Sequence, residues 1–166
     1  MNETGIVGAP RWVALLNLGR HTGLPLRQDL GDKEFDSVMA FFHNAEAAIE
    51  KEDIEGLMAL YSDQYSNGEH DKKAARAIWS RIFQTFDNMA AKHNMRIEVY
   101  AADSLIVRCS GLLMGLAKGE KYPITIDSWV EQDHILVKEG STWKLAGTTG
   151  KDRKRLWFDK PMHPLF

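Results

Sequence analysis

The spacing of apolar residues changes near Asn94, and this change constrains the fold more than any other feature. Before it, apolar residues recur every three or four positions, as on one face of a helix. After it they alternate: in MRIEVYAAD, Ile97 and Val99 point one way while Arg96 and Glu98 point the other. Helices are therefore expected to come first and strands second, as in an α+β domain.

Three helices are predicted before the change. Asp36 is the expected N-cap of the first and Asp53 that of the second. An uninterrupted apolar stripe predicts a third helix from about Lys72 to Lys92. The polar segment LYSDQYSNGEHDKK (60–73) is interpreted as the joint before this helix, in which Asp63 ends the second helix and Asp71 caps the third.

The second half predicts long antiparallel strands. LIVRCSGLLMGLA (105–117) is apolar at both parities, which is typical of a strand covered on both faces. This pattern also predicts a homodimer through the outer face of the sheet. YPITIDSWVEQDHILVKE (122–139) is long enough for one bent strand or two short ones, with Pro123 near its start. A turn at 139–141 leads into the last strand.

The composition is that of one soluble globular domain. The chain has 166 residues, of which 44% are hydrophobic and 27% charged, and a formal net charge of −2 gives no basis for binding nucleic acid or an anionic membrane. Cys109 is the only cysteine, so it is expected to be a small buried apolar residue. The start of the chain has no signal-peptide pattern, so a cytoplasmic location is expected, or a secreted or periplasmic one if a leader was removed.

The chain resembles the nuclear transport factor 2-like superfamily, the α+β cone shared with ketosteroid isomerases and SnoaL-like polyketide cyclases. The resemblance rests on AIEKEDIEGLMALYSDQY (48–65), on the helix that begins at Lys72, and on LVKEGSTWKLAG (136–147). It implies three N-terminal helices packed in a strongly curved antiparallel sheet, a cone or cystatin-like roll that encloses an apolar pocket. Family members often have a hairpin between the second and third helices, but SNGEHD (66–71) leaves room only for a turn.

The resemblance covers residues 35–150. It leaves residues 1–34 as an N-terminal arm that packs on the body and residues 151–166 as a C-terminal tail. The expected ligand is small and hydrophobic or anionic, and it would contact these pocket residues: Tyr61, Tyr65, Trp79, Phe83, Arg108 and Trp129.

Two functions are open at this point. One is a non-catalytic small-molecule-binding domain. The other is an isomerase, cyclase or hydrolase that uses Asp127 with Tyr65 or Arg108 in general acid–base catalysis of a small hydrophobic substrate. Ketosteroid isomerase has an aspartate base, but in the matching place this chain has Gln64 and Tyr65, which favours the first function.

Asp127 and Arg108 each have two interpretations. A carboxylate that pointed into an apolar cone would favour its protonated form and would suit acid–base work. However, Asp127 shares strand parity with Glu131 and Asp133, which suggests a solvent-facing row. Arg108, on an otherwise apolar face, predicts either a salt bridge to Asp127 or Glu98 or an anchor for an anionic ligand.

Metal and cofactor sites are not expected. The histidines at positions 21, 43, 70, 93, 134 and 163 form no HxxxH or HxH pair, and a single cysteine excludes CxxC. His70 and His134, each beside an aspartate, are interpreted as solvated turn residues.

Overall fold

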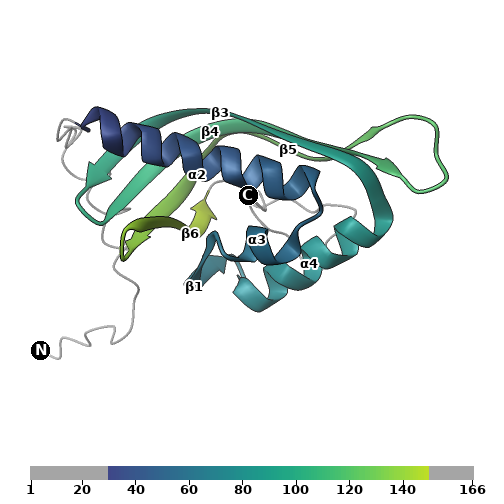
Figure 1. Cartoon of the computed structure of the whole chain (residues 1–166), viewed down its shortest axis with the longest axis horizontal. Helices are drawn as coiled ribbons and strands as arrows, with labels where there is room; N and C mark the ends of the chain where they lie inside the picture. Colours follow the sequence, from purple (N-terminus) through teal and green to yellow (C-terminus); the bar gives the residue numbers. More distant parts are fainter. Residues whose placement is uncertain (1–29, 150–166) are drawn as a thin grey trace, which may run out of the picture.

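A curved sheet arches over the helices in the computed structural model, which describes residues 30–149 (Figure 1). The elements are α2 (Asp32–Glu50), α3 (Ile54–Met58), β1 (Tyr61–Asn67), β2 (His70–Asp71), α4 (Lys72–Thr85), β3 (Phe86–Ala101), β4 (Ser104–Ala117), β5 (Ile124–Glu139) and β6 (Thr142–Thr149). The α+β class and the curved sheet expected from the sequence are confirmed. Most of the expected N-terminal arm and the whole C-terminal tail lie outside the described residues.

The six strands follow the order β2-β1-β6-β5-β4-β3. All neighbours are antiparallel except β1 and β6, which run parallel. The segment predicted as one bent strand or two short ones forms one strand, β5, and Pro123 lies just before its first residue, where its missing N–H does not weaken the ladder.

Two of the three predicted N-caps are confirmed. The carboxylate of Asp53 accepts a hydrogen bond from the Gly56 backbone N–H at 2.9 Å, and that of Asp71 accepts one from the Ala74 N–H at 2.8 Å. The prediction for Asp36 was wrong. The carbonyl of Gly31 accepts the first backbone bonds of α2, so the helix begins at Asp32 and Asp36 already lies inside it.

The third helix is shorter than predicted, because α4 ends at Thr85 rather than near Lys92. Phe86 has extended backbone angles (φ −120°, ψ 149°) and begins β3. Asn88 has φ 50°, and the β3–β4 register shifts between Asp87 and Ala90. Because of this bulge, Phe86 and Met89 are both buried although they are three positions apart in the strand. Buried residues three positions apart are also typical of a helix.

A hairpin separates α3 from α4, so the helices are not three consecutive N-terminal elements. β1 pairs with β2 through Ser66–Asp71 and Asn67–His70, around Gly68 with φ 58°. The segment 66–71 was predicted to be only a turn, but two residue pairs suffice for a short hairpin. Asp63 consequently lies on β1 and does not end the second helix.

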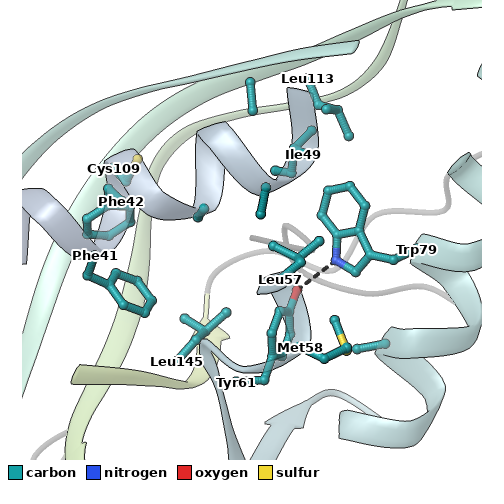
Figure 2. Packing of buried hydrophobic residues seen from close by; sticks show 14 of the residues in the cluster. Phe41, Phe42, Ile49, Leu57, Met58, Tyr61, Trp79, Cys109, Leu113 and Leu145 are labelled. Carbon is teal, nitrogen blue, oxygen red and sulfur yellow. Dashed lines mark hydrogen bonds between the residues drawn. The ribbon is translucent and has the colours of Figure 1, made fainter. Parts of the chain in front are cut away.

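The core fills the space between the helices and the concave face of the sheet. Figure 2 shows Phe42 and Ile49 of α2, Trp79 of α4 and Leu145 of β6 converging there. The indole N–H of Trp79 donates to the Tyr61 hydroxyl at 2.8 Å, which satisfies both polar groups inside the core. Burial raises the pKa of Tyr61 well above its usual range, although the Trp79 hydrogen bond opposes the shift.

We predict that Gly147→Ala destabilises the fold where β1 meets β6. A Cβ on Gly147 would overlap the carbonyl oxygen of Ser66, so the parallel pair must separate, at a cost of about 1–3 kcal/mol. Urea unfolding measures the change. Gly31→Ala is the control, because among residues 30–149 no atom beyond its two chain neighbours lies within 4 Å of the added Cβ. Equal effects in the two variants would contradict the prediction.

Candidate functional site

A small cavity lies between α2, α4 and the concave face of the sheet. Its lining residues are Ile49, Trp79, Ala91, His93, Leu113, Asp127 and Trp129. All of them except His93 and Asp127 are apolar. The cavity measures about 10 Å³, which is room for about one water molecule.

A bulge in β5 decides which side chains of that strand face the cavity. Cys109 pairs with Gln132 and Gly111 with Trp129, so two residues of β5, Val130 and Glu131, lie opposite Ser110 alone. Glu131 has φ 51°, and its N–H donates to the Ser110 hydroxyl at 3.0 Å. An extra residue reverses the inward parity of the strand.

Because of the bulge, Asp127 and Trp129 point inward before it and His134 points inward after it. Asp127 is 5% exposed and His134 is fully buried. The Oδ1 atom of Asp127 accepts a hydrogen bond from the Ser128 N–H at 2.8 Å. The solvent-facing row inferred from Glu131 was wrong for Asp127, and so was the interpretation of His134 as a solvated residue.

The side chains of His93 and Trp129 pack against each other above Gly111. They lie on β3 and β5, on either side of β4, and both are in register with Gly111. Strands spaced about 4.8 Å apart place the two backbones about 10 Å from each other. The ring centroids are nevertheless only 5.3 Å apart, with an interplanar angle of 49°. A Cβ on Gly111 would overlap the indole, so this contact requires a glycine.

Glu46 of α2 contacts both the backbone and the imidazole ring of His93. Its Oε1 accepts a hydrogen bond from the His93 backbone N–H at 3.0 Å and lies 3.1 Å from Nδ1. The side chain of His93 is fully buried and that of Glu46 is 12% exposed. A proton on Nδ1 is stabilised by the carboxylate, which leaves the lone pair on Nε2. In this tautomer Nε2 is the ring atom that can accept a proton.

The electrostatics of the pair favour an ionised Glu46. Burial acts to raise its pKa, but the hydrogen bond and charge of His93, with a smaller contribution from Lys92, outweigh burial, so the pKa is lowered overall. Lys92 Nζ lies 3.4 Å from Oε2. The carboxylate can therefore orient the imidazole over the neutral pH range.

A second buried imidazole lies close to this pair. The ring of His134 is 6.2 Å from those of both His93 and Trp129, and 5.9 Å from that of Phe42. Cys109 accepts a hydrogen bond from Trp129 Nε1 at 3.4 Å. Burial raises the pKa of the Cys109 thiol to about 11, which agrees with its expected role as a small apolar residue and not with that of a nucleophile.

Of the six expected pocket residues, Trp79 and Trp129 line the cavity. Tyr61, Tyr65 and Phe83 are buried in the core outside its lining. Tyr65 accepts a hydrogen bond from Asn67 at 3.2 Å, and burial raises its pKa above the usual range. The structure therefore brings Asp127 together with His93 and not with Tyr65.

Arg108 lies outside the cavity lining as well. Its guanidinium contacts both carboxylate oxygens of Asp133, at 2.8 and 3.2 Å. Asp133 is the direct cross-strand partner of Arg108. A salt bridge to an acid on the neighbouring strand was the expected arrangement, but the predicted partners, Asp127 and Glu98, were wrong: the bulge turns Asp133 outward and Asp127 inward.

The polar joint at 60–73 borders a second, shallow hollow. This hollow measures about 380 Å³ and is lined by Met58, Asp63, Asp71, Lys72, Lys73 and Arg76. Lys72 is paired with Asp63 at 2.7 Å and Arg76 with Glu55. His70 is 8% exposed, with Nδ1 3.3 Å from the Asn67 carbonyl, so its interpretation as a solvated residue was wrong. The charges of the joint serve capping and ion pairing.

Solved structures identify the fold. No family model and no curated protein matches the sequence. A conserved protein from Planctomyces limnophilus matches with a TM-score of 0.62 and 14% identity, over 71% of this chain and 94% of that one. A ketosteroid isomerase-like protein from Erwinia carotovora atroseptica matches at 0.55 and 18%, over 71% and 95%. A hexachlorocyclohexane dehydrochlorinase matches at 0.56 and 13%, over 70% and 82%.

The chain has the nuclear transport factor 2-like fold. The resemblance drawn from the sequence is thereby confirmed for the fold, which supports many activities and does not by itself assign one. Within residues 30–149 there is no group of three or more metal-ligating side chains, and no helix there is long and apolar enough to span a bilayer.

We predict that Glu46→Gln lowers the stability of the protein in a pH-dependent way. The pKa of Glu46 is lower in the folded state, so its contribution is present above the unfolded pKa and is lost as the pH falls through the folded pKa. The free energy of unfolding should therefore drop by about 1–2 kcal/mol near pH 7. The difference from the wild type should shrink below pH 4.5.

Urea unfolding at a series of pH values measures this difference. Glu50→Gln is the matched control, because Glu50 lies one turn along α2 with a 48% exposed side chain and is 3.8 Å from Lys92. It should change stability by less than about 0.5 kcal/mol at every pH. A Glu46→Gln effect independent of pH would contradict the lowered pKa.

Proposed function

We propose that this chain is an acid–base enzyme that removes a proton from carbon in a small, largely apolar substrate, by elimination or isomerisation. The observation that carries the proposal is the Glu46–His93 pair, of which His93 lines an apolar cavity that is also lined by Asp127. The two titratable groups of the lining differ in chemistry, one an imidazole oriented by a carboxylate and the other a carboxyl group. That combination suits paired proton transfer.

The steps follow from the positions of these groups. Nε2 of His93 takes a proton from a carbon of the substrate, and Glu46 stabilises the imidazolium that forms. The electron pair released from the C–H bond forms a new double bond. In an elimination, the Asp127 carboxyl gives a proton to a leaving hydroxyl, whereas a leaving halide departs as the anion. In an isomerisation, His93 returns its proton to another carbon.

The comparisons support this class of reaction without assigning it. One similar structure is a dehydrochlorinase and another is described as ketosteroid isomerase-like. The first name is that of an elimination and the second that of an isomerisation. At 13–18% identity these likenesses support the fold, and the proposal depends on the residues of this chain.

Non-catalytic binding of a small molecule is the competing function. The observation in its favour is that five of the seven lining residues are apolar. This function predicts saturable binding without turnover, so one assay distinguishes the two.

We expect deuterium to enter the substrate when the protein is incubated in D₂O with a panel of small cyclic ketones, alcohols and alkyl halides. Proton NMR measures this exchange and any new alkene. His93→Gln should lower the rate by about 10²–10⁴-fold for every substrate, because it removes the base. Asp127→Asn should lower by a similar factor only the rate of alkene formation from an alcohol, because only that reaction needs a proton for the leaving group. Glu46→Gln should lower the rate less than His93→Gln, since the imidazole remains.

His43→Gln is the control for this assay. His43 is an exposed histidine on α2, so its replacement should leave the rate unchanged. If every compound that binds is recovered without exchange or elimination, the protein binds small molecules without catalysis. A rate that survives His93→Gln would exclude His93 as the base.

We also propose a homodimer through the outer face of the sheet, as the sequence suggested. Leu112 of β4 and Val130 of β5 lie on this face and are 38 and 64% exposed, so that they present apolar surface that a second copy could cover. Sedimentation at micromolar concentration should show a dimer, and Leu112→Glu with Val130→Glu should give a monomer. Gln84→Glu, on an exposed position of α4, should leave the dimer intact. A monomeric wild type would end the proposal.

A further inference from the structure

Trp129 occupies most of the space beside His93. The indole is 3% exposed and fills the region between His93 and the Cys109 sulfur. The volume left over is about 10 Å³. A substrate of several heavy atoms therefore cannot reach His93 while the indole stays in this position.

The contacts that hold the indole of Trp129 in place are weak. Its N–H donates to a thiol sulfur at 3.4 Å, and sulfur is a weak acceptor. Its ring lies over Gly111, whose lack of a side chain leaves the β4 backbone as the surface beneath it. The next two residues, Val130 and Glu131, form the bulge, where the ladder with β4 is already interrupted.

The arrangement of the two rings also indicates what would replace the indole. A flat bicyclic ring packs against the imidazole of His93 at a centroid distance of 5.3 Å, within the range favoured for aromatic pairs. Trp79 provides a second aromatic surface in the same lining. A planar aromatic ligand would reproduce these contacts.

We propose that the indole of Trp129 holds the place of the ligand in this closed state, and that a planar aromatic or similarly flat cyclic ligand binds beside His93 when the indole moves aside. Trp129 then sets the size of ligand that the site accepts, and Gly111 provides the closed position of the indole. This inference rests on the proposed site around His93, but it concerns binding and stands apart from turnover.

The test uses indole as the probe and the full chain labelled with 5-fluorotryptophan. Trp129→Phe assigns the fluorine resonance of Trp129 among the five tryptophans. We expect saturable binding of indole to the wild type, a shift of the Trp129 resonance on binding, and nuclear Overhauser effects between indole and the ring protons of His93. Calorimetry should show that Trp129→Ala binds indole at least about tenfold more tightly, because the competing side chain is gone.

Trp143→Ala is the matched control. Trp143 is 4% exposed, and its N–H donates to Ser37 at 3.0 Å on a different part of α2. Its removal makes a cavity of similar size away from His93. If indole affinity rises equally in both variants, or if the wild type binds indole without a shift of the Trp129 resonance or does not bind it at all, the proposal is overturned. The wild-type measurement decides the matter even if a variant fails to fold.

His93→Phe separates this inference from the proposed reaction. It keeps a flat ring beside the ligand but removes both ring nitrogens. Indole affinity should stay within about threefold of the wild type while any proton exchange is lost. Binding without turnover in the wild type would end the proposed reaction and keep this inference, whereas turnover without movement of Trp129 would do the reverse.

Discussion

The one-residue bulge at Val130–Glu131 determines what the concave face of the sheet contains. Without it, the inward-facing positions would keep one parity from Asp127 to His134, so Asp127 and Trp129 could not face the helices together with His134. The extra residue is stabilised by the bond from its N–H to the Ser110 hydroxyl and requires a positive φ at Glu131. This bulge thus places the acid and the indole on the same face of the sheet as the second imidazole.

The sequence predicted the fold class well, because burial patterns and capping residues are local signals. Asp53 and Asp71 are N-caps, as their positions predicted. The error at the end of α4 has a physical cause: an apolar residue every three positions fits a helix, but it also fits a strand that begins with a bulge. The spacing of Phe86 and Met89 could not distinguish these, because a bulge depends on the neighbouring strand.

The site was harder to predict, because its residues are far apart in the sequence and come together only in the folded chain. Glu46 was the available signal, since an acidic residue between Phe42 and Ile49 interrupts an apolar helix face and needs a buried partner. The residue that provides it, His93, follows 47 positions later, on the first long strand. Gly111 is an equally weak signal in the sequence, although the approach of His93 to the indole depends on it.

The long strand that carries His93 is also an edge of the described sheet. Exposed strand edges invite pairing with other chains, and a 16-residue edge would be a strong template if it were flat and apolar. β3 is neither. Its register is broken in two places, and Lys92, Arg96 and Glu98 place charges along it. The bulge at Asp87–Ala90, which gave the start of this strand the spacing of a helix, is therefore also one of the features that make the edge a poor template for pairing with another chain.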